Sequence, residues 1–104
     1  MVDYVLLYTG GGEPSSEEER ATVLAAWNDW FAQIGDALKD GGNPFGPAAK
    51  AVASDGTVRE ATAQYSGYTI VSADSLEAAM AIAKGSPVLR GAGSVTVYET
   101  FPAM

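Results

Sequence analysis

The stretch from Gly67 to Glu99 reads GYTIVSADSLEAAMAIAKGSPVLRGAGSVTVYE, with a strand pattern on each side of a helix pattern. The β-branched and aromatic run Gly67–Ala73 predicts a strand. A capping box follows, with Asp74 as the expected cap, and it predicts a helix over Ser75–Lys84 that ends at the glycine and proline beyond it. Ser94–Glu99 carries valine at every second position and predicts the last strand. The helix is expected to direct its apolar side inward through Leu76, Ala79, Met80 and Ala83.

The N-terminal third predicts a strand followed by a long helix. Tyr4–Thr9 is apolar or aromatic on both of its faces, so we expect a central strand that is covered on both sides. A serine can cap the helix, and the apolar spacing extends it over about Ser16–Lys39, with Gly41-Gly42 as its end. Trp27 lies near the centre of the apolar stripe, which consists of Val23, Leu24, Trp27, Trp30, Phe31, Ile34 and Leu38.

The segment between this helix and Gly67 predicts a hairpin. Asn43–Pro47 is a stiff connector that contains two prolines, and Ala48–Ala53 follows as a weak strand. Ser54-Asp55-Gly56-Thr57 is typical of a tight turn, because an Asp-Gly pair accepts the positive φ angles that two-residue turns require. Val58–Ala63 is then either a short return strand or an irregular segment.

Elements in this order fit an α+β fold, the ferredoxin-like split βαβ sandwich, in a single domain over residues 1–104. Two helices would pack on one face of an antiparallel sheet. The other face would carry aromatic and β-branched residues whichever way the strands are turned, so we expect a second copy of the chain to cover it. A compact monomer of this mass keeps about 5,500 Å² of accessible surface. The low share of charged residues, 18%, also favours a homodimer.

Composition excludes several kinds of function. The chain has 6 basic and 13 acidic residues and a formal charge of −7, which argues against binding nucleic acid or an anionic membrane. It has no cysteine and no histidine, so cysteine nucleophiles and histidine bases are excluded, and neither a metal nor a cofactor is expected. The N-terminus lacks the positive charge and the long apolar run of an export signal, so a cytoplasmic location is expected.

Short motifs follow one another along most of the chain: Phe45-Gly46-Pro47, Ser54-Asp55-Gly56, Ser66–Val71, Ala73–Ala79, Ala83–Pro87 and Gly93–Glu99. In this order and spacing they resemble the YCII-related proteins, relatives of the group named for its DGPF motif. The resemblance implies a ferredoxin-like fold that dimerises sheet to sheet into a dimeric α/β barrel, and a function that is mostly unassigned. The His–Asp pair proposed for some members has no counterpart here, and Thr57-Val58 stands where the DGPF group has Pro-Phe.

The candidate ligand-binding residues are mainly aromatic: Tyr8, Trp27, Asn43, Phe45, Arg59, Tyr65 and Tyr68. Each also has a purely structural interpretation. Trp27 suits the core between helix and sheet, Asn43 and Phe45 suit a tight connector pinned in the core, and the segment around Arg59 and Tyr65 suits an exposed edge loop. Arg59 is one of few basic residues, and together with Arg90 it is a candidate to receive a substrate carboxylate.

Two kinds of function fit these observations. The first is a binding protein or cofactor-free enzyme for a small organic molecule, with a pocket between sheet and helices. The alternative is a non-catalytic interaction or regulatory module, whose sheet pairs with itself and whose acidic helix face meets a basic partner. Acid–base catalysis in the first case would rest on a side chain among Tyr8, Asp55, Glu60, Tyr65 and Tyr68.

Overall fold

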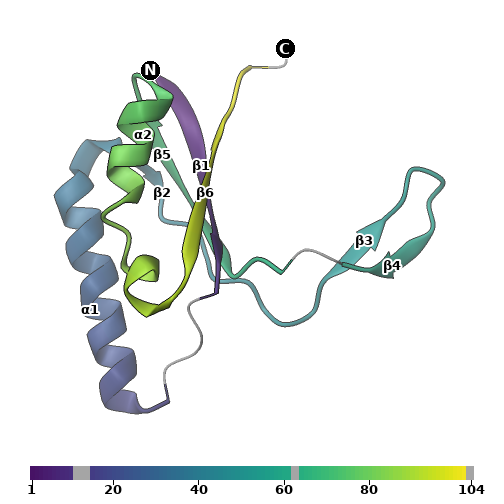
Figure 1. Ribbon diagram of the computed structural model, residues 1–104, viewed down its shortest axis with the longest axis horizontal. Coiled ribbons are helices and arrows are strands. Elements are labelled where there is room, and N and C mark those ends of the chain that lie inside the picture. The colour runs from purple at the N-terminus through teal and green to yellow at the C-terminus, as the bar shows by residue number, and fades with distance from the viewer. Residues whose placement is uncertain (11–14, 62–63, 103–104) are drawn as a thin grey trace.

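The computed structural model describes residues 1–10, 15–61 and 64–102, and it confirms the predicted α+β architecture. A four-stranded antiparallel sheet has the strand order β2-β5-β1-β6, consistent with a split βαβ fold. Helices α1 and α2 lie together on one face of this sheet (Figure 1). The strands are β1 Val2–Thr9, β2 Leu38–Asp40, β5 Gly67–Ala73 and β6 Ser94–Glu99, and the helices are α1 Glu17–Ile34 and α2 Leu76–Ala83.

β1 is the central strand, as predicted, and its two faces differ. Tyr4, Leu6 and Tyr8 are buried on the face that carries the helices. Val5 and Leu7 are half-buried and point to the opposite face, which neither α1 nor α2 covers in the single chain. We call this second surface the open face. By strand register its centre consists of Val5, Leu7, Tyr68, Ile70, Thr96 and Tyr98, and polar residues lie at its two ends: Asp3, Thr9, Ser72 and Ser94.

α1 begins as predicted but ends earlier. Ser16 caps it, and the helix stops at Ile34 instead of continuing to residue 39. Gly35 has a φ of 54°, and a short 3-10 turn then leads the chain into β2. There Leu38 pairs with Val71 of β5. The predicted helix end was wrong because the apolar spacing of Leu38 suits an edge strand as well as a helix, and pairing with β5 outweighs local helix propensity.

The apolar stripe of α1 reaches the core only in its second half. Trp30 is 3% exposed and belongs to the buried core. Val23 and Leu24, which the sequence placed on the same stripe, are 38% and 58% exposed. Their predicted burial was wrong because the first turns of α1 extend beyond the end of the sheet (Figure 1). The other stripe residues of the helix that pack against the core are Trp27, Phe31 and Ile34.

α2 starts one residue later than predicted. Ser75, and not the aspartate before it, is the cap, because its Oγ accepts a backbone N–H of the first turn at 3.1 Å. Ala79 is fully buried and Ala83 nearly so, but Leu76 and Met80 are 43% and 46% exposed, contrary to prediction. Alanines on the packing side bring the helix axis close to the sheet, which leaves the larger side chains on the outer side.

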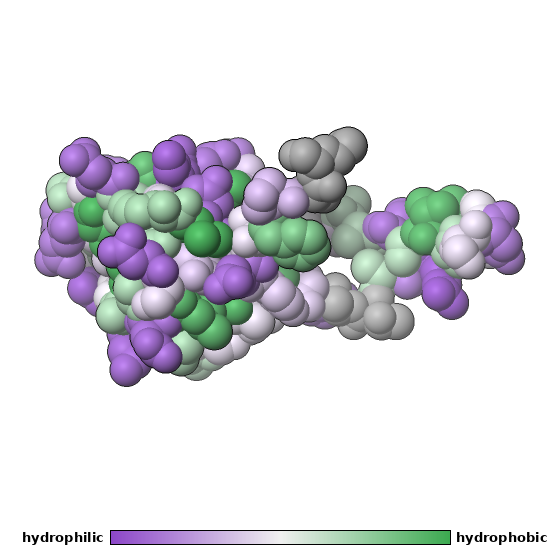
Figure 2. All heavy atoms as spheres, turned by 90° about the horizontal axis from the view of Figure 1, so that it is seen from above, coloured by the Kyte–Doolittle hydropathy of each residue, from purple (hydrophilic) through white to green (hydrophobic). Residues whose placement is uncertain are grey.

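Residues 45–61 leave the sheet as a separate hairpin, which we call the arm. It contains β3 Lys50–Val52 and β4 Val58–Glu60, paired antiparallel. Figures 1 and 2 show the arm standing well away from the rest of the protein. The chain consequently has a radius of gyration of 15.2 Å, whereas a compact domain of this length has about 13 Å.

The turn of the arm lies where the sequence predicts it, but it is not the expected two-residue turn. Only Gly56 has a positive φ, 90°, and the Ala53 N–H donates to the Thr57 carbonyl at 2.8 Å, so the loop has three residues, Ser54–Gly56. The Thr57 N–H donates to Asp55 Oδ1 at 2.9 Å, which favours this turn with its single glycine over one that needs a positive φ at Asp55 as well. β4 is the return strand, one of the two alternatives for Val58–Ala63, and it covers the first three residues of that segment. Thr62 and Ala63, which that prediction also included, lie outside the described residues.

Candidate functional site

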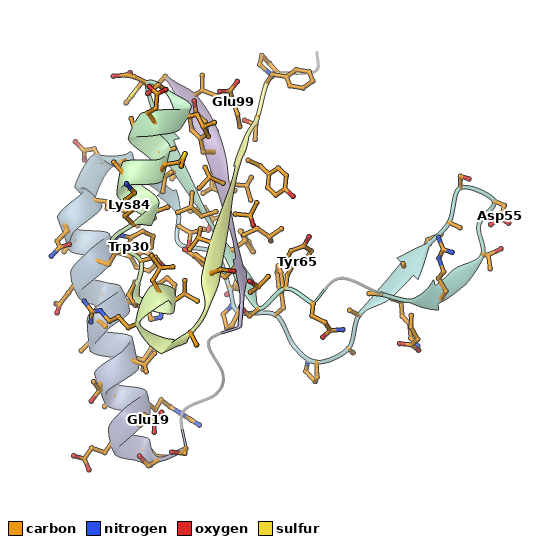
Figure 3. All side chains as sticks on the ribbon, in the orientation of Figure 1. Glu19, Trp30, Asp55, Tyr65, Lys84 and Glu99 are labelled. Atoms are coloured by element: carbon orange, nitrogen blue, oxygen red, sulfur yellow. The ribbon has the colours of Figure 1, made fainter. Side chains whose placement is uncertain are left out.

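The structure distributes the predicted ligand residues over three places. Tyr8 and Trp27 lie on the helix side of the sheet, where their rings are in contact. Arg59 lies on β4 of the arm. Figure 3 shows Tyr65 at the base of the arm, on the side of the sheet opposite Trp30. The remaining candidates gather near that base, where the arm leaves the sheet: Asn43, Phe45, Tyr65 and Tyr68.

The helix-side pair belongs to the core. Tyr8 is 5% exposed; its hydroxyl donates to Thr69 Oγ1 at 2.6 Å, and Thr69 donates to the Gly41 carbonyl at 3.1 Å. Trp27 packs edge-on against the Tyr8 ring, with centroids 5.3 Å apart. Burial raises the pKa of the Tyr8 phenol, so its hydroxyl is held neutral as a structural donor. Thr69 was not among the residues predicted from the sequence, although a threonine on the buried face of a strand requires a hydrogen-bond partner.

The connector that precedes the arm runs antiparallel alongside β5 in close contact, continuing from β2 to a bridge between Pro44 and Gly67. Gly42 has a φ of 72°, and a Cβ added there would lie 1.7 Å from the Tyr68 carbonyl oxygen. The Phe45 N–H then donates to the Ser66 carbonyl at 2.9 Å. The Phe45 ring stacks on Tyr68, with centroids 5.9 Å apart and an interplanar angle of 27°. Phe45 is 45% exposed, so it lies beside the open face and is not pinned in the core.

A groove of about 640 Å³ lies at the base of the arm. Phe45 and Tyr65 give it two aromatic side chains that are 45% and 41% exposed. Glu60 adds a carboxylate, which pairs with Lys50. Arg59 lies on the other face of the hairpin from Glu60, because successive strand residues point to opposite faces. The wall residues that matter here are Pro44, Phe45, Pro47, Glu60, Gln64 and Tyr65.

Asp55, one of the predicted acid–base candidates, serves the turn of the arm. Hydrogen bonds from the side chain and backbone of Thr57 lower the pKa of Asp55, so the carboxylate is ionised at neutral pH. Figure 3 shows Asp55 at the tip of the arm, at the far end from Tyr65. The carboxylate is therefore too far from the groove to act on a molecule bound there.

A family model, the YCII-related domain, matches residues 3–103. The chain belongs to the YCII-related domain family. The match runs through the sheet, both helices and the arm, so the arm of this YCII-related protein is a part of the domain. The comparison with curated proteins gives no match.

Neither α1 nor any other described helix has the length and apolar character needed to cross a membrane. Within residues 1–10, 15–61 and 64–102, no three side chains of His, Cys, Asp or Glu are grouped so that they could hold a metal ion. The acidic residues of α1 are exposed to solvent, as the sequence predicted: Glu17, Glu18, Glu19 and Asp29.

Proposed function

We propose that this YCII-related protein is a cytoplasmic homodimer, joined through its open face, that binds a small planar organic molecule in the groove without a metal or cofactor. The observation that carries the proposal is the exposed aromatic pair of the groove, Phe45 and Tyr65. This groove lies beside an apolar sheet face that the single chain leaves uncovered. The dimer and the groove are supported by separate arguments.

The open face has the character of a buried surface. A sheet face exposed to water usually carries polar residues, whereas this one carries Val5, Leu7, Ile70 and two tyrosines. The chain exposes 7311 Å², about a third more than the ~5,500 Å² expected of a compact monomer. A stable interface buries about 800 Å² on each partner, so a dimer can account for much of this excess.

The groove suits a flat, uncharged ring. Its volume of about 640 Å³ lies within the range of about 300–1,000 Å³ that is usual for small-molecule sites. Phe45 and Tyr65 offer faces on which an aromatic compound can stack. The Glu60 carboxylate and the net charge of −7 both disfavour an anion, whereas Gln64 offers a neutral amide for a hydrogen bond.

Binding fits the groove better than catalysis does. Its carboxylate, Glu60, is already paired with Lys50. The phenol of Tyr8, another predicted acid–base group, is buried on the helix side of the sheet. A general acid or base must lie within hydrogen-bond reach of the reacting atom. Neither Tyr8 nor Asp55 meets this condition for a molecule in the groove. Tyr65 does, but the carboxylate beside it is the paired Glu60, and we therefore propose ligand binding for the groove.

Light scattering at micromolar concentration is expected to give twice the 10.7 kDa mass of the chain. Tyr98→Lys places a charge on the open face at a position that is 51% exposed in the single chain, so the fold should tolerate the change. Burying an unpaired charge is unfavourable by several kcal/mol, so the dissociation constant should rise at least about tenfold. Leu24→Lys, at a 58% exposed position of α1, is the control and should leave the mass unchanged. A monomeric wild type would contradict the dimer.

A thermal-shift screen of planar aromatic compounds is expected to find ligands that raise the melting temperature of the wild type. A ligand at 100 times its Kd stabilises by about 2.7 kcal/mol, and Phe45→Ala should abolish most of this gain by removing one stacking surface. Phe101→Ala is the matched control, because Phe101 is 81% exposed and lies outside the groove. Hits that stabilise Phe45→Ala as much as the wild type would place the site elsewhere. A screen without hits would favour the non-catalytic interaction module.

A further inference from the structure

The arm has little core of its own. Its strands β3 and β4 have three residues each, and the ion pair of Lys50 with Glu60 joins them. Val52 and Val58 stand opposite each other in register and remain 69% and 61% exposed. A two-stranded hairpin without further packing is at best marginally stable in water. The exposed valine pair therefore indicates a surface that packs against another body.

The arm leaves the protein on the side of the open face. In Figure 1 the helices lie to the left of the sheet and the arm extends to the right. Figure 2, seen from above, also shows the arm clear of the main body, with hydrophobic residues on its surface. The sheet separates the arm from α1 and α2 of its own chain, so those helices cannot cover the valine pair. Any protein that covers the open face lies beside the arm.

The arm is long enough to reach across such a partner. About ten residues run from Phe45 to Ser54 at the turn, and an extended strand rises about 3.3 Å per residue, so they span up to about 30 Å. Facing sheets pack about 10 Å apart, and a helix layer behind the second sheet adds about 10 Å. The arm can therefore pass the edge of a second sheet and reach the helices behind it.

The charges of the chain suit this arrangement. Lys50 and Arg59 balance Asp55 and Glu60, so the arm is formally neutral and the whole charge of −7 belongs to the remaining residues. A neutral arm can approach an acidic body without net repulsion.

We infer that the arm of each subunit lies along the body of the other subunit, the body being the residues outside 45–61. Val52 and Val58, which share one face of the hairpin, pack on the partner. The inference rests on the proposed homodimer and adds two reciprocal arm contacts, related by the dimer's twofold axis, to the contact between open faces. The second copy is the occupant because the arm and the open face lie on the same side of the molecule.

Site-specific photo-crosslinking tests this inference. The chain has no cysteine, so a single engineered thiol carries a benzophenone label at one known position. Val58→Cys places the label on the arm, and Val23→Cys, at a 38% exposed valine of α1, is the matched control. Nitrogen-14 and nitrogen-15 protein are mixed until subunits have exchanged, irradiated, and analysed by mass spectrometry of crosslinked peptides. We expect several-fold more crosslinks between subunits from position 58 than from position 23, ending outside residues 45–61.

The outcomes separate the arm contact from the dimer itself. Light scattering on the labelled protein gives the oligomeric state; a monomer overturns both proposals. A dimer in which position 58 crosslinks only within its own chain, or only to the partner's arm, overturns the arm contact and leaves the dimer standing. As an independent measurement, Val58→Lys should raise the dissociation constant several-fold more than Val23→Lys does. Equal effects of the two variants would contradict the placement of Val58.

Discussion

Replacing Trp30 with alanine is expected to lower the free energy of unfolding by about 3–5 kcal/mol. The indole is 3% exposed and packs against Trp27 and Phe31, with ring centroids 5.6 and 5.5 Å away. Its Nε1 lies so close to Gly85, just after α2, that a Cβ added there would be 3.1 Å away. Trp30 therefore connects α1 to the end of α2, and the surrounding backbone has little freedom to fill the cavity.

Urea melts followed by far-ultraviolet circular dichroism measure this loss without relying on tryptophan fluorescence. Trp27→Ala makes the same chemical change one turn earlier, at a half-buried position, and should lower stability less. Trp30→Phe should also lower it less, because it keeps a ring and removes an Nε1–H that has no hydrogen-bond partner among the described residues. A larger loss for Trp27→Ala than for Trp30→Ala would contradict the packing described here.

The contrast between Trp27 and Trp30 shows how far sequence periodicity leads. The helical wheel placed both on one stripe and favoured Trp27, near its centre, as the core residue. Which member of a stripe is buried deepest depends on the tilt of the helix and on where the sheet ends. The first turns of α1 extend beyond the sheet, so the stripe residue that is buried deepest is Trp30 and not Trp27. Local sequence carries no information on that overhang.

Strands were predicted better than the helix ends. The bounds of β5 and β6 were correct, because each is a β-branched run between clear breakers. The end of α1 was wrong, since Leu38 fits a helical stripe and an edge strand equally well. The predicted cap of α2, Asp74, lies one residue before the observed cap, Ser75. Both residue types are good caps, and only the geometry of the preceding strand selects between them.

The candidate residues were chosen by residue type, without their arrangement. The rigid connector and Tyr65 were separate candidates, and the structure brings Phe45 and Tyr65 together at the groove because the arm begins and ends there. Tyr8 and Arg59 were placed in the same set on chemistry alone. Tyr8 points to the helix side through the alternation of β1, and Arg59 is carried away by the arm. The direction in which the arm leaves the sheet is a tertiary property that residue types do not encode.

Gly42→Ala is expected to lower the free energy of unfolding by about 2–5 kcal/mol. The sequence assigned this glycine to the end of a helix, but in the structure it lies, with a φ of 72°, in the connector that runs alongside β5. A left-handed conformation is unfavourable for alanine by about 1–2 kcal/mol. The added Cβ would also lie 1.7 Å from the Tyr68 carbonyl oxygen, so the connector or β5 must move.

Gly46→Ala is the matched control in the same connector, because a Cβ there meets no atom within 4 Å. Its stability should stay within about 0.5 kcal/mol of the wild type. The displaced connector in Gly42→Ala carries Phe45, so this variant should also lose the stacking of Phe45 on Tyr68 and with it the response to groove ligands. Urea melts measure the loss of stability. Thermal-shift assays that start at a temperature where the variant is folded measure its response to groove ligands. If the unfolding free energy of Gly42→Ala is within about 1 kcal/mol of that of Gly46→Ala, the connector does not lie as close to β5 as the structure shows.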